Sequence, residues 1–143
     1  MNMMFAYSEY TYPLDAWQVH NVTDMSGMFQ VSSYNQPLNT WHVHNVTNMS
    51  SMFMNSPYVY PLDNWQVYNV TDMSRMFKMT GYDQPLNAWQ VHNVRNMSEM
   101  FMNSNFSQPI DTWQISAATN TDRMFYGAQR PRNDWPSSIV KYN

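Results

Sequence analysis

Hydrophobic and polar positions repeat along this chain with a period of 24 residues. Tryptophans, prolines and Met-Phe pairs mark the register most clearly. The tryptophans at this spacing are Trp17, Trp41, Trp65, Trp89 and Trp113. One unit reads P-L-D/N-x-W-Q-V-H-N-V-T-D/N-M-S-x-M-F and is followed by a variable stretch that contains an aromatic residue. A register held this long predicts about five tandem copies of one small structural unit.

The first half of the unit alternates with a period of two. Trp17 and Val19 fall on one side of the alternation, and Gln18 and His20 fall on the other. This period is typical of a half-buried strand. We therefore expect a short strand over residues 16–20, with the tryptophan and the valine pointing inward.

The second half of the unit changes period. Met25, Met28 and Phe29 lie at i, i+3 and i+4, which is one face of a helical turn. Thr23 or Asp24 precedes them as an N-cap. Units of this kind bury their apolar sides by stacking. The predicted fold is an α/β, leucine-rich-repeat-like solenoid of about five 24-residue coils, each with one short parallel strand and one short helical turn.

The chain is expected to form a single solenoid domain over residues 1–143. It divides into a partial N-terminal repeat (1–12), the tandem 24-residue repeats (13–125) and a C-terminal cap (126–143). The repeat degenerates and charges gather toward the C-terminal end, as expected of a cap that faces water.

The N-terminal end shows the opposite character. Met1, Met4 and Phe5 enter in the middle of a repeat, and no charged residue appears before Glu9. The first coil is expected to leave an apolar face and a strand edge uncovered, which favours association. Two interpretations stay open: this end docks on another copy or another protein, or the chain is part of a longer array.

A slower alternation of aspartate and asparagine overlies the repeat. The residue after Pro-Leu is Asp15, then Asn39, then Asp63, then Asn87. A ladder of aspartates alone would place like charges about 5 Å apart, which is destabilising. Alternation separates the charges and allows each asparagine to donate to an aspartate. Duplication of a 48-residue unit explains the same pattern, and the two explanations are compatible.

The repeat motif resembles a known family. Residues 65–77, W-Q-V-Y-N-V-T-D-M-S-R-M-F, are similar to the W-x-V-S-N-V-T-N-M-S-x-M-F unit of BspA-like leucine-rich repeat proteins, and the resemblance extends over residues 1–125. That family is common in bacterial and mycoplasma surface lipoproteins and also occurs in some protists and large viruses. The resemblance implies a solenoid used for binding and adhesion, without shared catalytic residues. It suggests a cell or particle surface, although no signal peptide is visible at the start of the chain.

Composition narrows the classes of function. Charged residues make up 12%, the net charge is −3, and the seven lysines and arginines form no basic stripe. Binding to nucleic acid is therefore not expected. The absence of cysteine excludes disulfides, thiolate metal sites and cysteine nucleophiles. No apolar run approaches the ~18 residues of a membrane helix, so no membrane insertion is expected.

A ladder of imidazoles is the first candidate for chemistry. His20, His44, Tyr68 and His92 occupy equivalent outward positions, with His42 beside them. Neighbouring imidazoles can share a zinc ion. Tyr68 interrupts the ladder, however, and no carboxylate is placed to complete a site. The sequence therefore predicts neither a metal nor another cofactor.

Three further patterns have structural explanations. Met25 and Met28 begin a series of Met-x-x-Met pairs that could bind Cu(I), but at helical spacing beside a phenylalanine they indicate a core. Asp15 and Asp63 lie about two coils apart, just beyond the ~6.5–9.5 Å between the carboxyl groups of an inverting glycosidase. Every coil is alike, so nothing singles out one acid for catalysis. No enzyme is therefore expected. The Asn-Val-Thr sequences match the acceptor motif for N-linked glycans, but asparagine and threonine at these positions are explained by turns and caps.

The remaining candidate is the outward face of the predicted strands, which is polar and nearly uncharged. We expect a non-enzymatic binding or adhesion module that recognises a protein or a glycan on this face. The candidate residues are Gln18, His20, His42, His44, Gln66, Tyr68, Gln90, His92 and Gln114, flanked by Ala16, Thr40, Asn64, Ala88 and Thr112. The alternative is a structural component, for example of a virion or a surface layer, that assembles through Met1, Met4 and Phe5.

Overall fold

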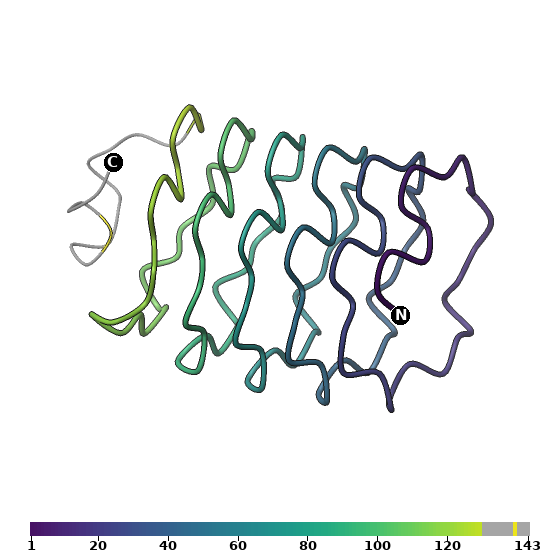
Figure 1. Ribbon diagram of the computed structural model, residues 1–143, viewed down its shortest axis with the longest axis horizontal. Coiled ribbons are helices and arrows are strands. Elements are labelled where there is room, and N and C mark those ends of the chain that lie inside the picture. The colour runs from purple at the N-terminus through teal and green to yellow at the C-terminus, as the bar shows by residue number, and fades with distance from the viewer. Residues whose placement is uncertain (130–138, 140–143) are drawn as a thin grey trace.

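The computed structural model describes residues 1–129 and Ile139. Figure 1 shows the chain winding in successive coils stacked along one axis, with the N-terminus in the coil at one end of the stack. Within the described residues there is no helix and no strand longer than a single bridge. The isolated parallel bridges join Asp24 to Asn48, Asn48 to Asp72, Asp72 to Asn96, and Asn96 to Asn120.

The predicted α/β leucine-rich-repeat-like solenoid, with a strand and a helical turn in each coil, is therefore wrong. The expected strand over residues 16–20 is absent because its backbone groups bond locally. The N–H of Trp17 donates to the carbonyl of Leu14 at 3.0 Å, and that of Val22 donates to Val19 at 2.9 Å. These i to i+3 bonds bend the segment at both ends. Period-two alternation survives in the side chains without a hydrogen-bonded sheet.

The expected helical turn is replaced by two tandem tight turns. Met28 donates its backbone N–H to Met25 at 3.2 Å, and Ser32 donates to Phe29 at 3.3 Å. The third residue of each turn has a positive φ, 59° at Gly27 and 52° at Val31. A left-handed residue at every fourth position prevents a right-handed helix from continuing. The spacing of Met25, Met28 and Phe29 thus reflects paired turns.

Backbone bonds between coils replace the missing helical bonds. In one junction the N–H of Phe29 donates to the carbonyl of Met52 at 2.9 Å, and that of Val31 donates to Met54 at 2.8 Å. The same pattern repeats from coil to coil. A buried backbone N–H group needs a hydrogen-bond acceptor. In this fold alternate N–H groups point along the stacking axis and donate to backbone carbonyls of the next coil.

The predicted N-cap position has a different role. The Asp24 carboxylate accepts bonds from the backbone N–H and the hydroxyl of Ser26, at 2.8 and 2.6 Å. Asn48 accepts from the N–H of Ser50 in the same way at 2.9 Å. These are Asx turns, in which the side chain substitutes for a backbone acceptor. Each Asx turn immediately precedes the first tight turn, and no helix follows it. The need for a side-chain acceptor and a donating serine two residues later explains the D/N-M-S motif.

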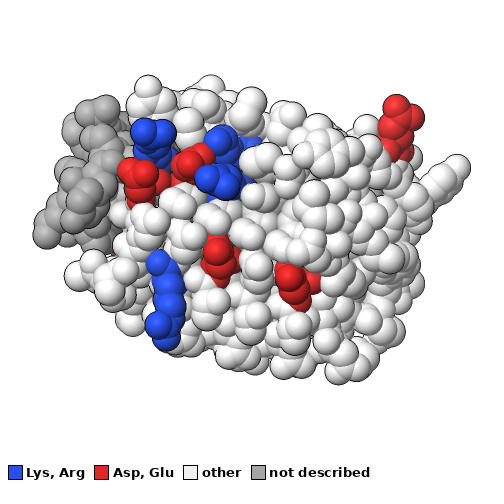
Figure 2. Space-filling model, viewed as in Figure 1, with Lys and Arg blue, Asp and Glu red and all other residues white. Residues whose placement is uncertain are grey.

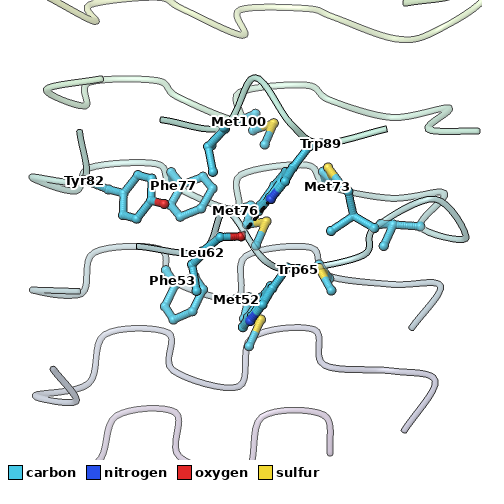
Figure 3. Packing of buried hydrophobic residues seen from close by; sticks show 14 of the residues in the cluster. Met52, Phe53, Leu62, Trp65, Met73, Met76, Phe77, Tyr82, Trp89 and Met100 are labelled. Atoms are coloured by element: carbon cyan, nitrogen blue, oxygen red, sulfur yellow. Dashed lines mark hydrogen bonds between the residues drawn. The ribbon is translucent and has the colours of Figure 1, made fainter. Parts of the chain in front are cut away.

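The core consists of ladders of like side chains. Figure 3 shows Phe53 and Phe77 from successive coils in equivalent positions, with Tyr82 beside the second ring. The ring centroids of Phe53 and Phe77 lie 5.8 Å apart at an interplanar angle of 9°. Methionines such as Met76 fill the space beside the rings and are fully buried. Because each coil offers only a small apolar side, stacking creates the core.

The sequence prediction of inward and outward positions is confirmed for the tryptophans from the second coil onward, but Trp17 in the first coil is 37% exposed. Trp41 is 3% exposed and Val43 1%, whereas His42 between them is exposed. Of the expected C-terminal cap, residues 126–143, most lies outside the described residues, but Ile139 is buried in the core. No helix in the described part of the chain is long and apolar enough to cross a membrane.

Candidate binding groove

The outward residues of the former strand segment form the candidate site. The column at the position of Gln18 continues through His42, Gln66, Gln90 and Gln114, and all five side chains are exposed. We call these five residues the amide column. In the second, third and fourth coils this exposed position lies between a buried tryptophan and a buried valine, for example between Trp41 and Val43.

Hollows recur beside the amide column in successive coils. One of them, of about 640 Å³, lies between the second and third coils. It is lined by Asn39, Thr40, Trp41, His42, Val43, Asn64 and Gln66. A second hollow, of about 340 Å³, lies two coils further on and is lined by the equivalent residues 87–92 with Thr112 and Gln114. A smaller hollow around residues 63–68, Ala88 and Gln90 lies between them. We call these three hollows together the amide groove.

The side chains of the amide column have no hydrogen-bond partner among the described residues. This distinguishes them from the asparagine column that contains Asn45 and the threonine column that contains Thr47. The Asn45 amide donates to the backbone carbonyl of His20 at 2.7 Å, and the Thr47 hydroxyl donates to the backbone carbonyl of Thr23 at 3.2 Å. The equivalent residues repeat these bonds in later coils. The Asn-Val-Thr sequons therefore hold the coils together, while the amide column keeps its donors and acceptors free.

The imidazole ladder is less regular than the amide column. His20 and His92 are exposed, whereas His44 and Tyr68 are half-buried. The ring of His44 lies 3.3 Å from the amide nitrogen of Asn45. Tyr68 and His92 each border a hollow of the groove. No cluster of three or more histidine, cysteine or carboxylate side chains suited to a metal ion occurs among residues 1–129.

Charge is sparse around the groove and concentrated elsewhere. Figure 2 shows one face of the molecule, mostly uncharged, with the charged side chains gathered mainly over its C-terminal half. Glu99 pairs there with Lys78 at 2.6 Å and with Arg75 at 3.4 Å. The hydrogen bond from Lys78 is the main reason why the pKa of Glu99 is lowered. Asp63 brings a carboxylate to the groove, and the amide of Asn39 donates to it at 3.1 Å.

The structure brings together most of the residues expected from the sequence and adds others. Gln66, Gln90, Gln114, His42 and His92 all border the groove. Asn39 and Asn87 line its rim and were not among the candidates. They follow Pro-Leu two residues before the inward tryptophan, on the inward side of the period-two alternation, so the alternation gave no signal for them. A fourth hollow, around residues 92–95 and 116–119, was also not anticipated.

A family model described as a Mycoplasma protein of unknown function, DUF285, matches residues 1–78 and again residues 54–141. The chain belongs to the DUF285 family. Two overlapping matches agree with a repeat that extends through nearly the whole sequence. No curated protein and no solved structure matches this DUF285 chain. The likeness to mycoplasma-type repeat proteins inferred from the motif is thus confirmed at the level of the family.

Proposed function

We propose that this chain is a non-enzymatic binding module that recognises an extended, uncharged glycan along the amide groove. One observation carries the proposal: among the described residues the amide column leaves its hydrogen-bonding groups free in successive coils, while the columns of Asn45 and Thr47 use theirs between coils. Identical groups at equal spacing suit a ligand that itself repeats. Amides and imidazoles both donate and accept, as sugar hydroxyl groups require.

A glycan fits this surface better than a folded protein does. Protein interfaces rely on buried aromatic or arginine anchors. The hollows beside Gln66 and Gln90 have no arginine among the described residues that line them, and their amide groups lie beside the largely buried Trp41 and Trp65. Tyr68 supplies one half-buried ring at the edge of the groove. We also propose that the chain is related to the BspA-like surface proteins, on the shared W-x-V-x-N-V-T-x-M-S-x-M-F motif. A role in adhesion at a cell or particle surface follows from both proposals.

The test is binding to a panel of neutral, unbranched polysaccharides and oligosaccharides, with extended peptides as the competing class. The groove variant Gln66→Ala/Gln90→Ala/Gln114→Ala removes three free amides without touching the bonds between coils. We expect it to bind at least tenfold more weakly than the wild type. The matched control Thr11→Ala/Ser33→Ala changes exposed residues outside the groove and should bind like the wild type. Binding only to peptides, or equal binding by both variants, would contradict the proposal.

A second candidate, structural assembly, is favoured by a separate observation. Met4 at the N-terminal end of the stack is 55% exposed, although equivalent positions in later coils are buried. We propose assembly through this end as the alternative function. Titration of the wild type by sedimentation velocity tests it, and a monomer at every concentration would contradict self-assembly.

A further inference from the structure

The N-terminal end of the stack exposes apolar side chains whose equivalents in later coils are buried. Met4 is 55% exposed, but Met28, one repeat later, is fully buried. Trp17 is 37% exposed, but Trp41 is 3% exposed. Met3 adds a further apolar surface at 42% exposure. We call this surface the N-terminal end face.

The end face also carries three backbone carbonyls without donors. In each internal junction, alternate N–H groups of one coil donate to carbonyls of the next; Phe29, for example, donates to Met52 at 2.9 Å. In the first coil the corresponding acceptors are the carbonyl oxygens of Asn2, Met4 and Ala6. None of these three oxygens accepts a hydrogen bond from the residues that the structure describes. They form a row at every second residue, in the register of the junctions that follow.

Unpaired side-chain donors lie on the same face. The indole N–H of Trp41 donates to the carbonyl of Leu14 at 2.9 Å, and the amide of Asn45 also donates to the preceding coil. Trp17 and Asn21 are the equivalent residues of the first coil. Neither side chain donates a hydrogen bond to any residue in the described part of the chain. The end face therefore presents one complete half of the interface that joins every pair of coils.

We propose that the N-terminal end face binds the N–H edge of a further coil of this same repeat type. The junctions within the chain define the required partner: backbone N–H groups at alternate residues, a carbonyl for the Trp17 indole, and apolar side chains to cover Met4. Two N-terminal end faces do not reproduce this junction, because the backbone N–H groups of Met3, Phe5 and Tyr7 already donate to the following coil and leave the carbonyl row of each copy without backbone donors. The chemistry thus selects a donor edge and fixes the direction of stacking.

A peptide of residues 72–95 provides the probe, because this segment already offers such an edge within the chain. Its residues Arg75, Phe77 and Met79 donate to the next coil at 2.9 to 3.0 Å. Its Leu86 carbonyl accepts the indole of Trp113 at 2.9 Å. On the end face the same groups would meet the three free carbonyls and Trp17. We expect one peptide to bind per protein chain, measured by calorimetry, with a blue shift of tryptophan emission as Trp17 is covered.

Two matched changes separate this docking from nonspecific apolar contact. N-methylation of the peptide at Phe77 removes one backbone donor and preserves every side chain. It should weaken binding about tenfold, as expected for the loss of one buried hydrogen bond. The protein variant Met4→Glu should also bind weakly, while Gln66→Ala/Gln90→Ala/Gln114→Ala should bind normally. Absence of binding, equal binding of the N-methylated peptide, or a symmetric end-to-end dimer that excludes the peptide would overturn the proposal.

Discussion

The indole N–H of Trp65 donates to the carbonyl oxygen of Leu38 in the preceding coil, over 3.0 Å. Figure 3 shows the equivalent pair one coil later, Trp89 and Leu62, which lie 2.9 Å apart. The tryptophan thus fills the core with its rings and links two coils with its one polar atom. This double role explains why tryptophan, with a buried N–H that needs a partner, is repeated at this position.

Removal of the Trp65 side chain should therefore be severe. We expect Trp65→Ala to lower the free energy of unfolding by roughly 3–5 kcal/mol, as for other large-to-small changes in cores. Gln66→Ala, on the exposed side, should stay within about 0.5 kcal/mol. Urea denaturation followed by circular dichroism measures both. Equal effects would contradict the inward and outward assignment.

The alternation of Asn39 and Asp63 makes an electrostatic prediction. The Asn39 amide donates to the Asp63 carboxylate at 3.1 Å, so Asn39→Asp replaces a hydrogen bond with a like-charge contact. We expect lower stability at low salt and partial recovery at high salt, because exposed charges are screened over a Debye length of about 10 Å at 0.1 M. The double variant Asn39→Asp/Asp63→Asn restores a mixed pair at positions 39 and 63 and should recover part of the stability, because Asp15 still precedes the new carboxylate by one coil. An unchanged melting temperature at low salt would leave duplication as the sole explanation of the alternation.

Val31 is a β-branched residue in the left-handed region, with φ of 52°. The equivalent positions one and three coils later are Asn55 and Asn103, which tolerate this conformation better. We expect Val31→Asn to raise the free energy of unfolding by about 0.5–1 kcal/mol, part of the ~1–2 kcal/mol cost of a left-handed residue. Val59→Asn is the control, because Val59 is also exposed but has no positive φ. A similar gain in both variants would refute strain as the cause.

The buried hydroxyls of Tyr34, Tyr58 and Tyr82 make no hydrogen bond of ordinary geometry with the residues that the structure describes. A backbone group of Leu14, Leu38 or Leu62 approaches each oxygen without reaching that geometry. Burial raises the pKa of Tyr34 to about 12 and raises those of Tyr58 and Tyr82 as well. The next coil places Phe106 at this position, fully buried. We expect Tyr58→Phe to be neutral or stabilising by up to about 1 kcal/mol, and Phe106→Tyr to be destabilising, because an unpaired buried hydroxyl is costly. Thermal melts of the two variants should shift in opposite directions.

Acid should weaken the fold through Glu99 and Asp24. The bond from Lys78 lowers the pKa of Glu99. Burial opposes ionisation of Asp24, but the bonds from Ser26 and Asn2 outweigh it and lower its pKa. A lowered folded-state pKa stabilises the protein above the unfolded value, about 4, and this stability is lost as the pH falls through the folded value. Urea melts between pH 7 and pH 2 should show this loss. Glu99→Gln should reduce it, and an identical pH profile would contradict the assignment.

Several features followed from the sequence alone because they depend on periodicity. The 24-residue register identified the ladders, and alternation around Trp41 and Val43 separated buried from exposed positions. The Asn39 to Asp63 bond also followed from the Asp/Asn alternation. The residues of the amide column could also be predicted, because exposed positions recur every 24 residues just as buried positions do.

Only the tertiary structure decided which acceptors the backbone N–H groups bond to. Met25, Met28 and Phe29 have helical spacing, yet Gly27 and Val31 adopt positive φ and their N–H groups donate to the following coil. The local sequence pattern cannot distinguish a helical turn from these paired tight turns, because both place the same side chains on one side. The backbone adopts the tight turns because the acceptor carbonyls lie 23 residues away, in the following coil. The hollows of the amide groove likewise arise between coils, where side chains far apart in the sequence meet. The sequence specified which residues repeat, and the contacts between coils determined their conformation.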